Sequence, residues 1–339
     1  MTFSITPSRI TSQIVQSMTL IAENIGLIEG AHLAQPDVHL RRKNRIQTIH
    51  ASLAIEGNTL NRKQVTALLD DKPVIGPQKE ILEVQNALAV YGQLAELDPL
   101  SMPSLLQTHG LMMRGLMAGA GSFRKGPVGV LRENNIFHEA SDWERVEPMM
   151  QALFSYLKSD GDHLLIKSCR FHYQLEYIHP FMDGNGRMGR LWQTLLLMLY
   201  HPIFEFLPME YFIHKNQQDY YRSLVKGDDT GDCTEFVTFI LEQIALALKL
   251  LTEDTRGITL SAENRLEFAG KVFENKTFSR KDYQNILKTI STATASRDLS
   301  LGIKIGLLVR SGDKRTARYR FKSDDHVLDG PTTKPHSWG

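Results

Sequence analysis

The spacing of apolar residues in the first 250 positions is mostly that of an α-helix. Residues 164–178 (LLIKSCRFHYQLEYI) and 190–201 (RLWQTLLLMLYH) are clear examples. Apolar residues three and four positions apart lie on one face of a helix, so each stretch would place a hydrophobic stripe against a core. The pattern predicts a mainly α-helical protein.

One stretch of this region has the pattern of a β-hairpin instead. In residues 126–140, GPVGVLRENNIFHEA, two short apolar runs flank a polar turn at Glu133, Asn134 and Asn135. Glycine and proline precede the first run, as is common at the start of a hairpin. The pattern predicts a small two-stranded flap.

The pattern changes after position 251. Residues 252–262 are polar and predict a linker. Residues 278–321 then have the pattern of helix, turn, helix and two strands, with a polar turn at 311–313. Residues 324–339 lack periodicity, which predicts a mobile tail.

Composition and charge refine this picture. The 339 residues are 42% apolar and 23% charged, as in ordinary soluble globular proteins. The net charge of +1 hides an asymmetry, because residues 263–323 carry 14 Lys and Arg against 6 Asp and Glu. That segment has a charge of +8 and the rest has −7, so the basic segment is the part of the chain that favours nucleic acid.

Cysteine usage and the amino terminus bear on the compartment. The two cysteines, Cys169 and Cys233, lack the spacing of a zinc site or of a disulfide framework. The first residues contain no apolar run of signal-peptide type, and no window approaches the roughly 18 apolar residues of a membrane span. These features predict a cytoplasmic protein in a reducing environment, without a membrane partner.

The stretch HPFMDGNGRMGR, residues 179–190, carries the strongest chemical signal. Gly184 and Gly186 flank Asn185, and such residues allow successive N–H groups to converge into an anion-binding nest at the start of the following helix. Arg187 and Arg190 lie three positions apart on one helix face, where both can bind phosphate oxygens. The arrangement suits a polyphosphate.

Two further residues of the stretch suggest a reaction. Phosphates would repel Asp183 unless a cation lay between them, and Mg²⁺ is typically held by one or two carboxylates together with phosphate oxygens. A neutral imidazole at His179 can take a proton from an incoming hydroxyl. The alternative is a glycine-rich connection with solvated polar residues. The Walker pattern G-x-x-x-x-G-K-[ST] is absent, so this is not the common ATPase loop.

The stretch resembles the Fic family signature H-x-F-x-[D/E]-G-N-G-R-x-x-R at every fixed position. Members of that family transfer part of a nucleotide, most often AMP from ATP, to a protein hydroxyl. The resemblance implies these roles: His179 as general base, Asp183 as Mg²⁺ ligand, the Gly184–Gly186 amides (Asn185 included) as the anion nest, Arg187 on the nucleotide phosphates and Arg190 on the γ-phosphate.

A second stretch, SLAIEGN at residues 52–58, ends an amphipathic pattern, with Gly57 in the position of a helix C-cap. A carboxylate at the negative end of a helix is disfavoured, so Glu56 should have a cationic partner, and Arg190 is a suitable one. The stretch resembles the family's inhibitory motif [S/T]-x-x-x-E-[G/N]. The resemblance implies that Glu56 pairs with Arg190 and obstructs the productive γ-phosphate position; the alternative is a solvated glutamate.

Two other regions resemble family features more weakly. The hairpin resembles the flap that holds the target's chain by main-chain hydrogen bonds, although it can also be purely structural. NQQDYYRSL, residues 216–224, resembles the segment that often borders the adenine, which suggests Asn216, Tyr220 and Tyr221 as base contacts. Paired tyrosines are equally common as core or rim residues.

The basic C-terminal segment resembles a winged helix. DNA contacts would then be expected at Arg297 on the second helix and at Arg318, Arg320 and Lys322 on the wing. Such domains also serve as protein-docking or dimer surfaces, so DNA binding and protein binding both stay open. The pattern itself is generic.

The sequence thus predicts a Fic helical core with a β-hairpin flap and a winged-helix domain. The expected function is a self-restrained protein adenylyltransferase that uses ATP and Mg²⁺ on a Ser, Thr or Tyr hydroxyl, self-modification and a homodimer being allowed. Alternatives are AMP removal or transfer of another phosphate-containing group, and a DNA-binding regulator that senses nucleotide. The predicted organisation is an N-terminal helical region with the inhibitory helix (1–95), the Fic core (96–251), the linker (252–262), the winged helix (263–323) and the tail (324–339).

Overall fold

The computed structural model describes most of the chain, in two compact units that divide between Thr255 and Arg256. Each unit is described by itself. The described residues are 4–30, 38–132, 135–139, 142–159, 161–256, 262–274, 276–287, 290–313 and 316–322. The predicted tail, 324–339, lies outside them.

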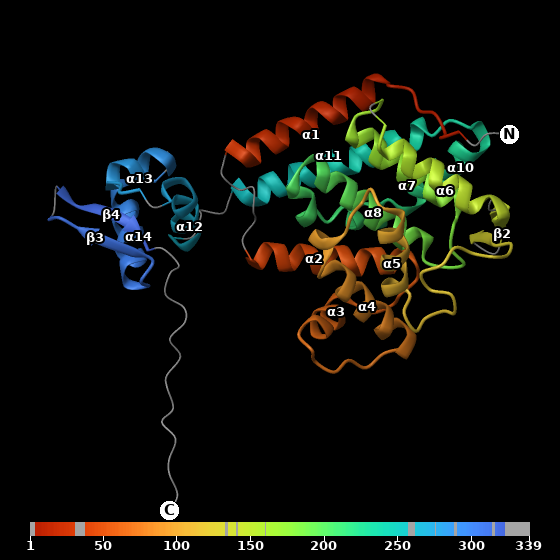
Figure 1. Ribbon diagram of the computed structural model, residues 1–339, viewed down its shortest axis with the longest axis horizontal. Helices are drawn as coiled ribbons and strands as arrows, with labels where there is room; N and C mark the ends of the chain where they lie inside the picture. Colours follow the sequence, from red (N-terminus) through yellow and green to blue (C-terminus); the bar gives the residue numbers. More distant parts are fainter. Residues whose placement is uncertain are drawn as a thin grey trace, which may run out of the picture. The chain divides into compact units, whose positions relative to one another are not determined.

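The first unit is built almost wholly from helices (Figure 1), which confirms the mainly α-helical prediction. Its α-helices are α1 (Ser12–Gly30), α2 (Val38–Ile55), α3 (Arg62–Leu69), α4 (Gln78–Tyr91), α5 (Met102–Met112), α6 (Val146–Leu157), α7 (Leu164–Ile178), α8 (Asn185–Tyr200), α9 (Met209–Lys215), α10 (Gln217–Thr230) and α11 (Thr234–Arg256). Three short 3₁₀ helices are η1 (Leu94–Glu96), η2 (Trp143–Arg145) and η3 (Pro202–Phe206).

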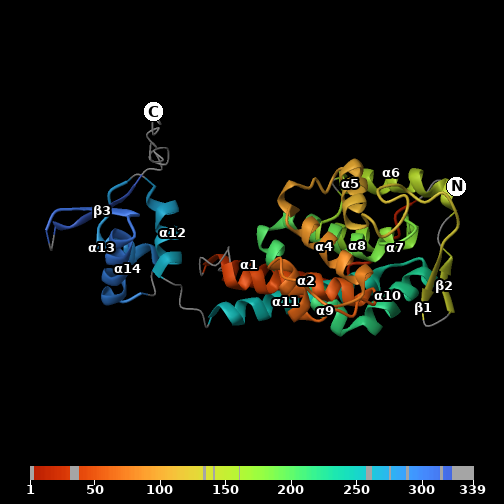
Figure 2. The same ribbon diagram turned by 90° about the horizontal axis from the view of Figure 1, so that it is seen from below.

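Helices α7 and α8 run through the middle of this unit, between two hydrophobic clusters (Figures 1 and 2). Cys169 and Tyr173 of α7 belong to the cluster shared with α1 and α11, whereas Phe171 and Leu175 belong to the cluster shared with α2, α4, α5 and α6. Because α7 is buried on both sides, the loop that joins it to α8 starts from a fixed position.

The predicted flap is present as an antiparallel pair, β1 (Gly129–Arg132) and β2 (Asn135–Glu139). The sequence pattern had placed Asn135 in the turn. In the structure Arg132 pairs with Asn135, so Asn135 is the first residue of β2. The register shifts between Val130 and Leu131, which marks a β-bulge. The turn residues 133 and 134 lie outside the described residues.

The boundary of the predicted linker is corrected by α11. This helix continues to Arg256 and therefore includes the first five residues of the stretch 252–262. Thr252 is buried and donates its hydroxyl to the carbonyl oxygen of Leu248 at 2.8 Å, while Leu251 packs in the core. The hydroxyl of Thr252 is satisfied within the helix, so this polar residue can be buried in α11, whereas its polarity in the sequence suggested a loop.

The second unit contains α12 (Ala262–Phe273), α13 (Arg280–Leu287), α14 (Thr292–Lys304), β3 (Leu308–Ser311) and β4 (Arg318–Phe321). The two strands pair antiparallel, and their inward residues Leu308 and Phe321 pack with the helices. Buried Arg265 donates from Nε and Nη2 to the two carboxylate oxygens of Asp298, both at 2.6 Å, which ties α12 to α14. Helix α12 precedes the predicted helix, helix, strand, strand order.

None of the helices that the structure describes combines the length and the apolar composition that a transmembrane segment requires.

Candidate active site

A cleft of about 300 Å³ opens where the α7–α8 loop, the end of α2, the start of the flap and α10 meet. It brings together residues that are far apart in the sequence, including both of the predicted functional motifs. The residues lining it are Ile55, Glu56, Val128, Glu176, His179, Met182, Asp183, Gly184, Asn185, Gly186, Arg190, Tyr220 and Tyr221.

His179 lies at the end of α7 in the left-handed conformation, with φ 50° and ψ 61°. A non-glycine residue there needs support from its surroundings. Arg124, which is buried, donates from Nε to the carbonyl oxygen of His179 at 2.7 Å and from Nη1 to that of Gly126 at 2.9 Å. Arg124 therefore ties the histidine to the start of the flap.

The hydrogen bond of the His179 ring indicates which nitrogen carries the proton when the ring is neutral. Nδ1 lies 3.3 Å from the carbonyl oxygen of Glu176. A carbonyl can only accept, so the proton of the neutral ring is on Nδ1 and Nε2 keeps its lone pair. The ring is thus in the tautomer that a general base requires.

A second histidine, His109 of α5, packs against the α7–α8 loop. Its ring stacks on Phe181 with centroids 3.7 Å apart. The amide of Gly121 donates to Nδ1 at 2.9 Å, so Nε2 carries the proton and donates to the carbonyl oxygen of Asp183 at 3.0 Å. Burial lowers the pKa of His109 to about 4, which keeps this support neutral near pH 7.

The predicted anion nest begins at Gly184, which has φ 86° and precedes the first residue of α8. Asn185 is buried and closes the loop, because its side chain accepts from the amide of Phe181 and donates to its carbonyl oxygen, both at 2.9 Å. A Cβ at Gly186 would collide with Oε1 of Glu56 and lie 3.0 Å from Nη1 of Arg190. Glycine at position 186 therefore leaves room for the Glu56 carboxylate beside the start of α8.

Asp183 and Arg187 form an ion pair at the edge of the nest. Nη2 of Arg187 is 3.0 Å from Oδ1 of Asp183, and the amide of Gly184 donates to the same oxygen at 2.6 Å. Nη1 of Arg187 lies 3.6 Å from Oε1 of Glu83. Arg187 is buried and does not line the cleft in the described structure, so its guanidinium orients Asp183 in this arrangement.

The Asp183 side chain is 50% exposed, and its second oxygen makes no hydrogen bond with the described residues. One free carboxylate oxygen beside the predicted anion nest fits Mg²⁺, which is commonly bound by one or two carboxylates plus phosphates and water. Within the described residues, no three His, Cys, Asp or Glu side chains gather into a site that holds a metal by themselves. Any cation here would therefore depend on the bound phosphate.

Arg190 lies at the inner wall of the cleft and contacts the end of α2. Nη2 donates to Oε1 of Glu56 at 2.7 Å and to the carbonyl oxygen of Ser52 at 2.9 Å, and Nε donates to the Ser52 hydroxyl at 3.2 Å. Burial by itself lowers the pKa of Arg190, but Glu56, Tyr220 and Glu176 together outweigh burial and the pKa is raised. A buried, charged guanidinium at the cleft wall is thus paired with a carboxylate that is 30% exposed.

Two of the three predicted base contacts line the cleft, and the third does not. Tyr220 and Tyr221 line the cleft, and the Tyr220 hydroxyl lies 3.1 Å from Nε2 of buried His172. Asn216 is not at the cleft. Its side chain donates to the carbonyl oxygen of Phe212 at 3.1 Å and to Oε1 of Gln243 at 3.0 Å, because residue 216 lies at the junction of α9 and α10 and faces α11.

Sequence reasoning missed Arg124, His109 and Glu176. Arg124 and His109 hold the loop from segments more than 50 residues away in the sequence. No local pattern distinguishes them from other arginines and histidines. Glu176 carries a weak signal, since it lies three residues before His179, one helical turn away and on the same side of α7.

Comparison with known proteins identifies the family of the chain. The model of the Fic/DOC family matches residues 99–197, which include the α7–α8 loop. A crystal structure of a Fic family protein from Desulfovibrio desulfuricans G20 is 37% identical, with a TM-score of 0.71 over 95% of this chain and 99% of that one. The chain therefore belongs to the Fic family.

Other similar proteins are more distant. The protein adenylyltransferase Fic of Drosophila willistoni is 27% identical over 254 residues, 68% of this chain and 48% of that protein. The chain spans about half the length of the curated relatives it matches. A fragment of Fic-1 from C. elegans, 22% identical, shares the fold with a TM-score of 0.58 over 71% of this chain and 73% of that one.

Proposed function

We propose that this chain is a protein adenylyltransferase that transfers AMP from ATP to a Ser, Thr or Tyr hydroxyl of a protein, itself included. The observation that carries the proposal is the cleft, where the lone pair of His179, the free oxygen of Asp183 and the amides of the nest converge. The name of the Drosophila relatives supports the same reaction.

The chemistry assigns each residue a step. The target oxygen attacks the α-phosphorus, its proton passes to Nε2 of His179, and the bond from the α-phosphorus to the bridging oxygen breaks as pyrophosphate leaves. The nest amides bind phosphate oxygens throughout. Asp183 would hold Mg²⁺ against the phosphates, and this ion supplies charge neutralisation when bound.

Glu56 restrains this reaction in the proposed mechanism. The γ-phosphate of ATP would bind most favourably beside the Arg190 guanidinium. The carboxylate of Glu56 already occupies that position, because its Oε1 lies 2.7 Å from Nη2 of Arg190. Two anions cannot share that position without repulsion, so ATP would bind with its triphosphate displaced and its α-phosphorus out of line. Withdrawal of Glu56 would permit the productive position.

The flap is proposed to hold the target. The described β1 and β2 form a two-stranded sheet, and each strand has one edge not paired to the other. An extended segment of the target can add to such an edge through main-chain hydrogen bonds. Val128, directly before β1, lines the cleft, so a segment bound there would pass beside His179.

The decisive experiment uses ATP labelled at the α-phosphate in one sample and at the γ-phosphate in another, with Mg²⁺ and intact-mass analysis. AMP transfer leaves only the α-label on protein, and chelation of Mg²⁺ abolishes it. Retention of the γ-label would instead identify phosphoryl transfer. Absence of label with both the wild type and Glu56→Gly would refute the proposal, and release of AMP from a modified protein would identify the reverse reaction.

We also propose that the second unit is a winged helix that binds DNA, supported by its order of elements and its exposed basic side chains. Arg297, Arg318, Arg320 and Lys322 are exposed. Fluorescence anisotropy of the full chain with labelled duplex DNA tests this. Arg318→Glu with Arg320→Glu should remove binding, and rising salt should weaken it steeply, whereas His179→Ala should leave it unchanged. No binding at low salt would favour protein docking.

A further inference from the structure

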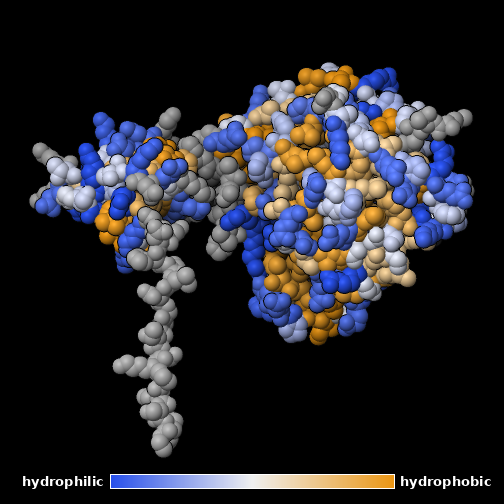
Figure 3. Space-filling model, viewed as in Figure 1, coloured by the Kyte–Doolittle hydropathy of each residue, from blue (hydrophilic) through white to orange (hydrophobic). Residues whose placement is uncertain are grey.

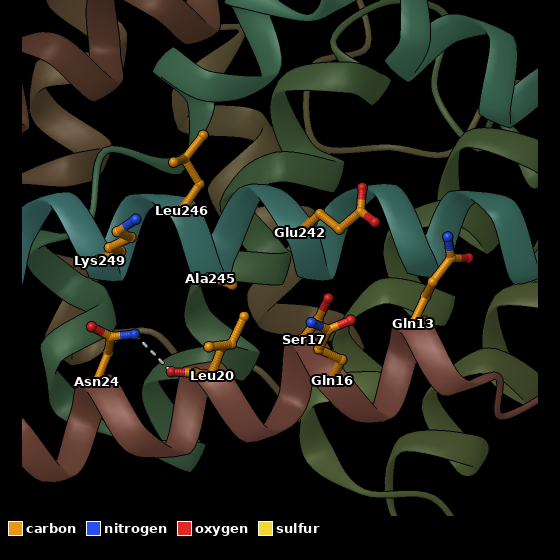
Figure 4. A pocket seen from close by; sticks show the side chains of 9 residues that line it. All are labelled: Gln13, Gln16, Ser17, Leu20, Asn24, Glu242, Ala245, Leu246 and Lys249. Atoms are coloured by element: carbon orange, nitrogen blue, oxygen red, sulfur yellow. Dashed lines mark hydrogen bonds between the residues drawn. The ribbon is translucent and has the colours of Figure 1, made fainter.

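Helices α1 and α11 lie side by side and leave a groove of about 330 Å³ along their outer surface (Figures 1 and 4). The two helices run in the same direction, with Gln13 and Glu242 at one end of the groove and Asn24 and Lys249 at the other (Figure 4). The residues lining the groove are Gln13, Gln16, Ser17, Leu20, Asn24, Glu242, Ala245, Leu246 and Lys249.

The centre of the groove exposes leucines that do not belong to the core. Leu20 is 42% exposed and Leu246 is 41% exposed, whereas Ile14 and Ile21 on the inner side of α1 are fully buried. Leu27 and Leu250 continue the exposed stripes toward the ends of the two helices, and Figure 3 shows hydrophobic side chains at the surface over α1. A second apolar stripe on a helix already packed on a core suggests a partner.

The ends of the groove carry charges of opposite sign. Glu242 and Lys249 are exposed and lie seven residues apart on α11, which places them on one face about 10 Å from each other. Neither takes part in an ion pair with another described residue. On α1, Gln13 and Gln16 offer amides at one end, and at the other Asn24 donates to the Leu20 carbonyl oxygen at 2.8 Å while its own amide oxygen remains able to accept.

We propose that this groove is the interface of a symmetric homodimer. A two-fold axis through its centre would invert the groove, so that Glu242 faces Lys249 of the partner subunit and each glutamine end faces the partner subunit's Asn24. The small residues Ser17 and Ala245 at the floor would admit the leucines of the other copy. The result is an antiparallel four-helix arrangement, a common packing for helix pairs.

The symmetry of the polar groups selects a second copy over an unrelated partner. A groove with opposite charges at its two ends complements itself only when inverted, which a two-fold axis does. The size is also suitable. Helices of 19 and 23 residues present a face about 30 Å long and about 20 Å wide, and two such faces bury about 1,200 Å², the lower limit for specific interfaces.

Charge reversal provides the test, with molecular mass measured by sedimentation equilibrium over a wide range of protein concentration. The wild type should show a monomer–dimer equilibrium. Glu242→Lys alone and Lys249→Glu alone each place like charges together twice, and each should raise the dissociation constant at least about tenfold, or 1.4 kcal/mol. The double variant restores both pairs with exchanged signs and should recover the wild-type value.

The control is Glu147→Lys, the same charge change at an exposed position of α6 that does not line the groove. It should leave the dissociation constant unchanged, with folding of every variant confirmed by circular dichroism. A wild type that stays monomeric overturns the proposal. So does a dimer that tolerates both single reversals, or a double variant as weak as the single ones.

Discussion

His179 combines a chemical demand with a conformational one, since its ring must hold a lone pair while its backbone adopts φ 50°. Alanine at this position would remove the ring and also strain the left-handed backbone, whereas asparagine tolerates that conformation better than most residues. The substitution His179→Asn therefore separates the two demands. A loss of activity in this variant is a loss of chemistry.

We predict that His179→Asn and His179→Ala both reduce AMP transfer by about 10²–10⁴-fold, the usual effect of removing a general base. ATP should still bind, because the nest and Asp183 remain. Transfer is measured with α-labelled ATP and binding by equilibrium dialysis. Transfer near the wild-type rate in the asparagine variant would eliminate His179 as the base.

Glu210 of α9 is a buried acid close to the site. Its side chain is fully buried, Oε1 accepts from the Tyr91 hydroxyl at 3.2 Å, and Oε2 has no hydrogen-bond partner in the described structure. Burial raises its pKa from 4.5 to about 7. The folded state thus keeps the proton up to about pH 7, whereas the unfolded chain loses it above about pH 4.5, so this group lowers stability as pH rises between those values.

We therefore predict that Glu210→Gln stabilises the protein at high pH. The wild type must bury a charge above about pH 7 and glutamine does not, so the free energy of unfolding should rise on the order of 1 kcal/mol or more at about pH 8, and the gain should shrink toward about pH 5. Urea unfolding at both pH values measures it. A gain of equal size at both would show that packing, not ionisation, is responsible.

At the scale of elements, the end of α2 decides where Glu56 lies. Gly57 has φ 91°, its amide bonds to the carbonyl oxygen of Ala54 at 3.0 Å, and the amide of Asn58 bonds to that of Leu53 at 3.1 Å. This left-handed ending turns the chain sharply after the glutamate. No heavy atom would meet a Cβ at position 57, so only backbone strain opposes a larger residue there.

We predict that Gly57→Ala lowers the free energy of unfolding by about 1–2 kcal/mol, the cost of a left-handed alanine. The matched control is Gly26→Ala, in the interior of α1, where a Cβ also meets nothing but φ is not positive. That change should stabilise by about 0.5–1 kcal/mol. Urea unfolding of both variants compares the signs; equal effects would contradict a left-handed requirement at position 57.

The elements also show what the sequence can and cannot reveal. Helices α7 and α8 and the loop between them were predictable, because apolar spacing and a glycine-rich motif are local signals. The ion pair of Arg187 with Asp183 was not, since a spacing of four allows the contact without requiring it. Asn216 shows the opposite error, where a resemblance suggested a base contact and packing against α11 turned the side chain away.

At the scale of the whole molecule, the two predicted motifs become one site. Glu56 and Arg190 are 134 residues apart in the sequence, and in the structure Oε1 of Glu56 lies 2.7 Å from Nη2 of Arg190. In the sequence, the unfavourable position of a carboxylate at a helix end predicted a cationic partner, and the resemblance to the inhibitory motif implied that this partner is Arg190. The sequence could not supply Ser52, whose carbonyl oxygen and hydroxyl also bind Arg190 and fix the guanidinium against α2.

The corresponding prediction has a sign opposite to that of most active-site substitutions. Glu56→Gly should increase Mg²⁺-dependent self-labelling at least about tenfold, equivalent to 1.4 kcal/mol, because the freed guanidinium can then bind the γ-phosphate and align the α-phosphorus. Glu56→Gly with Arg190→Ala should lose the gain. Labelling with α-labelled ATP at matched protein concentration measures both.

Ser52→Ala is the control, since it removes one acceptor from Arg190 and leaves the Glu56 carboxylate in place. It should not activate, because the restraint depends on the negative charge competing with the γ-phosphate and not on loosening the arginine. Unchanged or reduced labelling in folded Glu56→Gly would remove the inhibitory role. A gain that survives Arg190→Ala would mean that Glu56 acts through a different group of the cleft.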